Sequence, residues 1–426
     1  MVFRGHFALG SFKIGALWPG VEWAGKIPAS PLRGMPHSES QNFAVDPELL
    51  AAGVPQYRTM RRLFLTLLLI VSAGSCAGEK RLVLIDQDGS GPGGSNQMAI
   101  LAFLEAPNVE VLGITIVTGD GWRDEETAHT LRMLELTGHE NIPVARGAVF
   151  PLLRTEKETR LAEALDGKVA WLGAWGEGQT TLTETANGVT PMVTRQFKEH
   201  SPYTIPAMAE GMPKTQPIDE DAAHFLIRQV RAHPHAVTIY AAGPMTNIAL
   251  AVSIDPDFAA LTKGIVMMGG SLNPNTEDPE FATSPRHEFN FWFDPEAARI
   301  VLRADWPRID VTTVDVSIKA PFTQAMLDEI RKAQTSAAKY IASWSQDRYY
   351  LWDELAACAW LDPTLIRKEK LVYMDVDVSH GPSYGDTLTW TEKFKPVTGV
   401  RLVHAQVDVD LTRFENMFVR LMTGAQ

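Results

Sequence analysis

The stretch LIDQDGSGPGGSNQMAIL, residues 84–101, holds the features that decide the fold. An apolar run ends in two carboxylates, Asp86 and Asp88, and a loop of glycines then leads into an apolar stretch of helical character. A strand, a polar loop and a helix in this order are typical of a parallel α/β sheet at the edge where ligands bind. The stretch therefore predicts an α/β fold with a site beyond this strand.

Two kinds of site fit the stretch. Gly89, Gly91 and Gly94 satisfy the G-x-G-x-x-G pattern of a dinucleotide-binding loop. Asp88, however, stands immediately before the first glycine, where it would repel a pyrophosphate. The Asp-x-Asp pair instead offers the hard oxygen ligands that Ca²⁺ and Mg²⁺ prefer, and Asn96 could add an amide oxygen. On the pattern alone a metal site is favoured over a nucleotide cradle.

The same alternation continues along residues 81–426. Apolar runs predict strands, and amphipathic stretches between them predict helices, at 98–104 and 124–138. The predicted strands lie at 82–85, 109–117, 236–243, 264–270 and 309–316. Strands that alternate with helices predict a mainly parallel central sheet flanked by helices, in an open Rossmann-like arrangement. With no linker in residues 81–426, residues 78–426 are predicted to form one domain.

Polar residues follow several of these strands. Asp86 and Asp88 end the first strand, Asp120 follows the second, and the turn at 243–246 follows the third. The carboxyl ends of parallel strands share one edge of the sheet, so these residues should line one crevice.

Composition excludes some classes of protein. The chain has 426 residues, 45% of them hydrophobic, and a formal net charge of −12 without a basic run. A duplex nucleic-acid binder needs a basic face, so we expect no nucleic-acid partner. Only two cysteines are present, Cys76 and Cys358, which excludes a disulfide framework and a zinc ribbon.

The N-terminal region has the pattern of an export signal. Met60-Arg-Arg precedes the apolar run 63–71 and a small-residue zone, so residues 60–77 read as a secretory signal whose translation starts at Met60. Residues 1–59, rich in Gly, Pro and Ser, would then be a disordered upstream extension. Ala-Gly-Ser-Cys76 also resembles a lipobox, which would place a lipid anchor at Cys76. We expect an exported protein that is periplasmic, secreted or lipid-anchored.

Five later segments resemble one family. They are GPMTNIALA (243–251), GIVMMGGSL (264–272), HEFNFWFDPEAARIVL (287–302), LWDELAACAWLDP (351–363) and VDVDLTRFENMFVRLM (407–422). In order and spacing they are similar to the inosine-uridine-preferring nucleoside hydrolases, over nearly all of residues 81–424. The resemblance implies a nucleoside hydrolase-like fold and hydrolysis of the N-glycosidic bond of a ribonucleoside, giving ribose and free base.

The resemblance also implies a bound Ca²⁺ and its ligands. Asp88 would bind the ion and act as the base that deprotonates a bound water. Asp353 and the backbone carbonyl of Thr246 would be further ligands. Asp86 would support the metal site, and Asn96 could donate its carbonyl oxygen.

Further residues are implied on the substrate side. Glu288 and Asn290 would hydrogen-bond the ribose, and Asp120 stands where the family usually has an asparagine near the sugar. Trp352 replaces a histidine that helps to protonate the base in some members. Trp171 and Trp175 lie in a loop where some purine-selective relatives place a stacking aromatic, although packing in the core or in a lid is an equal alternative for both.

The first motif departs from the family pattern. That pattern runs Asp-x-Asp-Pro-Gly, one residue, then Asp-Asp, whereas here the two closing positions are Ser95 and Asn96 after a longer loop. Fewer carboxylates predict weaker Ca²⁺ binding. For Ser95, a contact to a sugar hydroxyl is the expected role.

Three functions therefore stay open at this point. The leading one is Ca²⁺-dependent hydrolysis of a small nucleoside-like substrate. The second is a catalytically impaired member of the same fold that binds a ribosyl ligand. The third, least favoured, is a nucleotide-cofactor oxidoreductase built on the glycine loop. The resemblance further implies a homo-oligomer.

Overall fold

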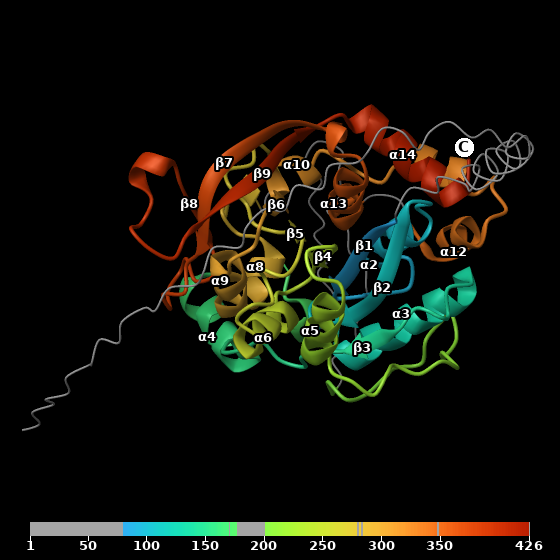
Figure 1. Ribbon diagram of the computed structural model, residues 1–426, viewed down its shortest axis with the longest axis horizontal. Helices are drawn as coiled ribbons and strands as arrows, with labels where there is room; N and C mark the ends of the chain where they lie inside the picture. The colour runs from blue at the N-terminus through green and yellow to red at the C-terminus, as the bar shows by residue number, and fades with distance from the viewer. Residues whose placement is uncertain are drawn as a thin grey trace, which may run out of the picture. The chain divides into compact units, whose positions relative to one another are not determined.

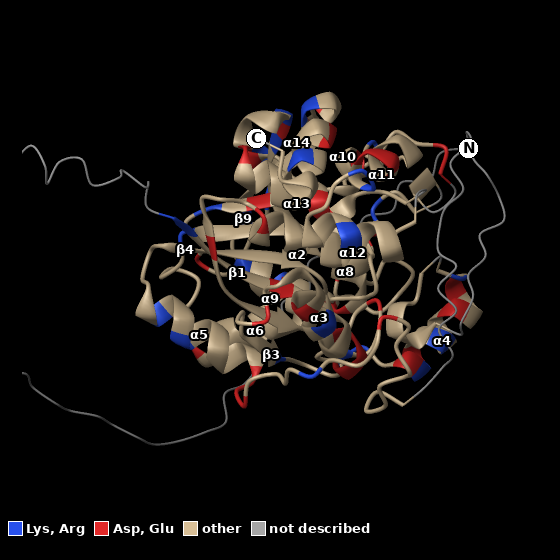
Figure 2. Ribbon diagram, turned by 90° about the vertical axis from the view of Figure 1, so that its right-hand side faces the viewer, with Lys and Arg blue, Asp and Glu red and all other residues tan. Residues whose placement is uncertain are grey.

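The computed structural model describes residues 80–169, 171–176, 201–278, 281–282, 284–346 and 349–425. The predictions for residues 1–77, including the signal and the lipid anchor, lie outside these described residues. Within them, no helix is both long and apolar enough to span a bilayer. Charged residues of both signs lie along the helix surfaces, as on α4 (Glu156–Asp166) in Figure 2.

The strands of the described chain form one sheet in the order β3-β2-β1-β4-β5-β6-β9-β7-β8 (Figure 1). Their bounds are β1 Arg81–Gln87, β2 Val109–Ile116, β3 Val144–Arg146, β4 Val237–Ala242, β5 Gly264–Met268, β6 Ile309–Thr312, β7 Ile366–Val376, β8 Thr387–Trp390 and β9 Arg401–Val409. The pairs from β3 through β9 are parallel, and β7 pairs antiparallel with both β9 and β8. The predicted mainly parallel sheet is confirmed.

The remaining elements are helices. They are α2 Ser95–Leu104, α3 Arg123–Thr137, α4, α5 Ala222–Ala232, α6 Thr246–Ile254, α8 Phe289–Phe293, α9 Pro295–Arg303, α10 Val314–Ser317, α11 Gln324–Ile330, α12 Ser336–Trp344, α13 Trp352–Leu361 and α14 Leu411–Thr423, with 3-10 turns η2 Gly173–Trp175, η3 Pro363–Leu365 and η4 Glu392–Phe394. Figure 1 places α5, α6 and α9 together and α13 and α14 together on another part of the sheet.

Two cores lie on the two faces of the sheet, because successive side chains of a strand point to opposite faces. Val83 and Ile85 of β1 belong to the core shared with α2, α3, α13 and α14. Leu84, between them, belongs to the core shared with α5, α6 and α9. β1 is thus buried on both sides, which explains why its sequence is a continuous apolar run.

The chain order reverses beside β1. From β1 the chain proceeds outward to β2 and β3, and it then returns to β4 on the other side of β1. In open α/β sheets ligands bind in the crevice beyond the carboxyl ends at such a point. Asp88 follows β1 there, and α6 begins four residues after β4 ends.

One predicted element is wrong in part. The run 309–316 was expected to be a single strand, but β6 ends at Thr312 and α10 begins at Val314. Val314 donates its N–H to the Gly270 carbonyl (3.0 Å) instead of continuing a strand. The β-branched composition of this run hides the change from strand to helix.

Candidate active site

Asp88 lies where β1 ends, and both of its carboxylate oxygens accept hydrogen bonds. Oδ2 accepts from the backbone N–H of Asp120 (2.9 Å), and Oδ1 accepts from the Asn96 side-chain amide (2.7 Å). Asp88 is 1% exposed. The carboxylate is therefore fixed in orientation by the loop after β2 and by the start of α2.

Asp353, on the first turn of α13, meets Asp88 at the same amide. Asn96 Nδ2 lies 3.3 Å from Asp353 Oδ2, and Gln87 Nε2 donates to that oxygen at 3.0 Å. Asp88 and Asp353 are 265 residues apart in the sequence, yet both carboxylates contact the Asn96 side-chain nitrogen. The expectation that they lie close together matches this geometry.

Two glycines make room for the Asp88 side chain. A Cβ on Gly119 would lie 2.2 Å from Asp88 Oδ2, and one on Gly243 would lie 2.7 Å from the Asp88 nitrogen. The ends of β2 and β4 can therefore approach the carboxylate only because both positions lack a side chain.

The Asp86 side chain lies on the face of the sheet that α6 covers, whereas Asp88 contacts Asn96 on α2. Its Oδ1 accepts from Thr115 on β2 and from the Asn247 amide on α6 (2.8 Å). Burial raises the pKa of Asp86 to about 7. Asp86 therefore connects β1 with β2 and α6.

Asp120 connects the site to the loop around residue 171. Its backbone binds Asp88, and its Oδ1 accepts from the Trp171 indole N–H (2.6 Å). Trp171 is thereby connected to Asp88 through Asp120. Trp175 is different, because it is 3% exposed and stacks on Phe293 with ring centroids 4.4 Å apart. That position favours packing for Trp175.

Glu288 and Asn290 come from the beginning of α8. Glu288 accepts from the backbone N–H groups of Asn290 (2.8 Å), Phe291 (3.0 Å) and Gly270 (2.9 Å), so it caps the helix. Asn290 Nδ2 donates to the Met268 carbonyl at the end of β5 (3.1 Å). Burial raises the pKa of Glu288 to about 7, and the Asp120 charge adds to the effect.

The acidic groups act on one another. Burial raises the pKa of Asp88 well above its usual range, and the charges of Asp120 and Asp353 raise it further. Burial likewise raises the pKa of Asp353, with contributions from Asp120 and Glu288. Carboxylates that are buried together disfavour ionisation unless positive charge joins them. The site is therefore suited to a cation.

Two more buried glutamates adjoin the site, and the sequence pattern did not single them out. Glu126 on α3 accepts from the Gly121 N–H (2.5 Å), and its raised pKa reflects burial and the charge of Asp88. Glu354 follows Asp353 and accepts from the Ser95 hydroxyl (2.6 Å). Acidic residues in the first turn of a helix are common because they favour the helix dipole, so the pattern carried no signal for either residue.

Thr246 begins α6, and its hydroxyl donates to Asp294 Oδ2 (2.7 Å). The backbone carbonyl is the atom to which the family resemblance assigns a ligand role. Asp294 in turn accepts from the backbone of Leu152 (2.8 Å) and caps α9. The start of α6 is thus held in place from outside the crevice.

Aromatic side chains gather beside Asp353. Trp352 makes edge contacts with Tyr350 (centroids 4.9 Å apart) and Phe281 (5.9 Å). The Tyr350 hydroxyl lies 3.4 Å from Asp278 Oδ2. We call Phe281, Tyr350 and Trp352 the aromatic wall. Tyr349 and Trp352 both pack against the core on this side of the sheet, and the Tyr349 hydroxyl lies 3.5 Å from Met98 Sδ.

The glycine loop is filled by protein groups. The Gly93 N–H donates to the Tyr340 hydroxyl (3.1 Å), and the Gly93 carbonyl accepts from Ser345 (2.7 Å). Gln97 Nε2 donates to the Gly89 carbonyl (3.1 Å). These backbone groups are engaged with α2, α12 and the residue after α12, which argues against a cradle for a nucleotide phosphate.

The residues present fit a calcium ion. Asp88 and Asp353 offer carboxylate oxygens that converge on one amide, and rotation of the Asn96 amide would present a third oxygen. Buried carboxylate oxygens of Asp86, Glu126 and Glu354 have no hydrogen-bond partner in the part of the chain that the structure describes. An excess of buried acceptors over donors is what a hard cation requires.

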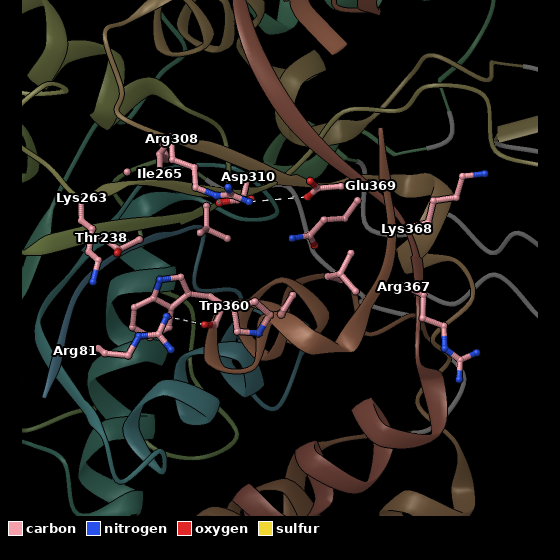
Figure 3. Close-up of a pocket in the computed structure, with 16 residues that line it drawn as sticks. Arg81, Thr238, Lys263, Ile265, Arg308, Asp310, Trp360, Arg367, Lys368 and Glu369 are labelled. Carbon is pink, nitrogen blue, oxygen red and sulfur yellow. Dashed lines mark hydrogen bonds and ion pairs between the residues drawn. The ribbon is translucent and has the colours of Figure 1, made fainter. Parts of the chain in front are cut away.

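A pocket of about 530 Å³ lies at the opposite edge of the sheet, where β1, β4, β5 and β6 begin (Figure 3). Its charged groups largely satisfy one another. Arg308 binds Asp310 with two hydrogen bonds of 2.7 Å, and Arg81 donates to the carbonyls that end α13. Asp310, Glu369 and His404 also approach one another there, but Arg308 already neutralises the Asp310 carboxylate. The candidate active site is therefore the cluster of buried polar side chains around Asp88.

Known proteins with similar sequences are nucleoside hydrolases and nucleosidases. The chain matches the family described as "Inosine-uridine preferring nucleoside hydrolase" over residues 83–416. It is 31% identical to probable uridine nucleosidase 1 of Oryza sativa over 267 residues, which cover 62% of this chain and 68% of that one. It is 30% identical to the pyrimidine-specific ribonucleoside hydrolase RihA of Salmonella arizonae, covering 58% and 65% of the two chains.

Solved structures agree on the fold. A plant nucleoside hydrolase, the PpNRh1 enzyme, superimposes with a TM-score of 0.61 and 26% sequence identity, covering 80% of this chain and 99% of that chain. A purine-preferring ribonucleoside hydrolase from Gardnerella vaginalis gives a TM-score of 0.60 at 23% identity, covering 81% and 98%. The second likeness bears on the fold alone.

Proposed function

Because the chain belongs to the inosine-uridine preferring nucleoside hydrolase family, we propose that it hydrolyses the N-glycosidic bond of a ribonucleoside with the help of Ca²⁺. Membership makes it a hydrolase that acts on N-glycosyl bonds. The single observation that carries the proposed site is the convergence of Asp88 and Asp353 on the Asn96 amide. A nucleotide-cofactor oxidoreductase is not supported, since the glycine loop is engaged with other parts of the protein.

Asp88, Asp353, Asn96 and the Thr246 carbonyl would hold the ion, with Asp86 behind them. Ca²⁺, when bound, would make a bound water more acidic and hold the ribose hydroxyls. Asp88 would accept the proton of the attacking water. The Asp120 N–H and the Asn96 amide donate to its two oxygens, so the orientation of the Asp88 carboxylate is set before substrate binds.

Glu288 and Asn290 would hydrogen-bond the ribose. The Glu288 carboxylate is fixed by three backbone N–H groups, so its position is set before substrate binds. The sugar acquires positive charge as the bond to the base breaks. The buried carboxylates around the site would stabilise that charge without reorganisation, since they are already in place.

The aromatic wall and Trp171 would bind the base. Trp352 precedes Asp353 at the start of α13, and Trp171 is hydrogen-bonded to Asp120, so aromatic residues from two separate segments adjoin the site residues. Stacking desolvates the base and holds it in place. The similarity to uridine and pyrimidine nucleosidases makes uridine and cytidine the first substrates to test.

The test is release of reducing sugar from uridine, cytidine, inosine and adenosine, with and without a chelator. We expect base release from at least one nucleoside, loss of that activity with the chelator, and recovery on adding Ca²⁺. Activity that is indifferent to chelation would contradict the metal assignment. Binding of nucleosides without any release of base would identify the impaired alternative, which Ser95 and Asn96 suggest.

Asp88→Asn and Asp353→Asn test the two carboxylates directly. Each change should abolish turnover and weaken Ca²⁺ binding, because it removes a formal charge from the ligand set. Each variant should still fold, since neither side chain belongs to an apolar core. Calorimetric titration with Ca²⁺ and a thermal melt on all three proteins provide the measurement. Equal Ca²⁺ binding by the three would rule out the proposed ligands.

A further inference from the structure

The hydroxyl of Ser95 is bound to a buried carboxylate. Ser95 is the first residue of α2, and its Oγ donates to Glu354 Oε2 at 2.6 Å. The same Oγ lies 3.4 Å from the backbone N–H of Asp353. The position that carries an acid in the family pattern is therefore linked here to an acid on another helix.

Glu354 is placed next to the proposed cation site. It is 0% exposed, it follows Asp353 in the first turn of α13, and its Oε1 has no hydrogen-bond partner in the described chain. A buried carboxylate with an unpaired oxygen is costly unless positive charge lies nearby. The adjacent feature that could supply positive charge is a cation held by Asp88 and Asp353.

We propose that Glu354 supplies, from behind Ser95, the negative charge that positions 95 and 96 lack, and so strengthens cation binding. The inference rests on the proposed function and extends it to a residue outside the ligand set. Glu354 is a positioning residue, because it acts through Ser95 and through its charge. The carboxylate is thus on α13 rather than on α2, and the Ser95 hydroxyl connects the two helices.

An alternative role is purely structural, because the hydrogen bond also joins α2 to α13. The two roles predict different effects on Ca²⁺ affinity. If Glu354 serves only as a clamp, Glu354→Gln should leave Ca²⁺ binding unchanged, because the Gln carbonyl can still accept from the Ser95 hydroxyl. If its charge serves the cation, the variant should melt at the same or a higher temperature without Ca²⁺, since a buried repulsion is removed.

The first experiment compares Glu354→Gln with wild type by Ca²⁺ calorimetry and by thermal melts with and without Ca²⁺. Residues that support metal ligands typically change metal affinity by about 10–100-fold, and we expect a loss in that range. Glu110→Gln is the matched control. It removes the same charge from an exposed position in β2 and should leave Ca²⁺ affinity unchanged.

The second experiment places a carboxylate at position 95 of α2 and removes the one at position 354. The double variant Ser95→Asp with Glu354→Gln should bind Ca²⁺ at least about tenfold more tightly than Glu354→Gln alone, because the carboxylate returns to α2. A clamp would not predict this rescue, since the double variant restores the charge but not the original hydrogen bond.

The outcomes separate the two proposals. If wild type and Glu354→Gln bind Ca²⁺ equally well, the role of Glu354 is overturned and the proposed function is left intact. Failure of the double variant to recover affinity would also overturn it. Wild type that binds no Ca²⁺ would overturn both proposals.

Discussion

Trp352 stands where some family members carry a histidine, and its ring contacts Tyr350 and Phe281. Replacing it with histidine would introduce a group that titrates near neutral pH beside the base. We expect Trp352→His to leave ribose binding intact and to change the preference among nucleosides or the pH dependence of kcat/KM. The measurement is kcat/KM for uridine and inosine from pH 5 to 9. Identical profiles would show that Trp352 only packs.

His287 gives the fold a sensitivity to acid. It is buried against Trp292, and burial, with the Arg154 charge, lowers its pKa to about 4. The unfolded chain binds this proton near pH 6.5, so folding stability should fall as the pH drops from 6.5 to 4, by about 3 kcal/mol in total. His287→Gln should flatten that part of the profile. The free energy of unfolding is measured by urea titration of both proteins at pH 7, 5.5 and 4. The same dependence on pH in wild type and variant would show that His287 is not the titrating group.

Single residues were predictable where chemistry and pattern coincide. Asp88 at a strand end and Asp353 in a recognisable segment were identified from the sequence. Glu126 and Glu354 were not, because an acid in a first helical turn has an ordinary explanation in the helix dipole. Asn96 was expected to offer its carbonyl, whereas here its amide donates to both carboxylates. Only the structure reveals which partners surround such residues.

Among the elements, α13 carries a proposed site residue at its start and is capped by an arginine at its end. Its first turn carries Asp353, and its last carbonyls accept from Arg81 at 2.6 and 3.1 Å. The Arg81 guanidinium also lies 3.5 Å from the Trp360 ring centroid (Figure 3). A cation at a helix C-terminus stabilises the helix through its dipole and its carbonyls.

Arg81→Met should therefore lower the free energy of unfolding by about 1–2 kcal/mol, since a charge–dipole contact and a cation–π contact are lost together. Activity of the folded variant should be close to that of wild type, because the change is at the far end of α13 from Asp353. Lys263→Met, on the rim of the same pocket, is the control. Equal denaturation midpoints for the two variants would contradict the capping role.

Elements were predictable where hydrophobic periodicity is strong. The strand expected at 109–117 is β2, and the helix expected at 124–138 is α3, each within a residue or so. Strand β7, between β9 and β8, was not expected, because its sequence IRKEKLVYMDV has four consecutive charged residues near its start and its first half is largely exposed. Its pairing with β9 is a long-range contact that local patterns do not encode.

At the scale of the whole molecule, the site exists because the chain order reverses at β1. The segments around residues 88, 120, 246, 288 and 353 come from different strand–helix units, and the parallel sheet directs their carboxyl ends to one edge. The sequence predicted part of that edge, since residues 88, 120 and 246 follow apolar runs, whereas residues 288 and 353 were implied by the family resemblance. It could not predict that Trp171 would bind Asp120 or that Ser95 would bind Glu354, because those contacts depend on how loops and helices pack.

The sheet also bears on where the mature chain starts. β1 begins at Arg81, and the family match begins at residue 83. We propose that the protein is exported and begins near Cys76 or Gly78. A protein that starts at residue 78 should match the full chain in melting temperature and in nucleoside hydrolysis. One that starts at residue 91 should not fold, because it lacks β1 and Asp88. Mass spectrometry of the native protein measures the start directly, and intact residues 1–59 on a cytosolic protein would refute export.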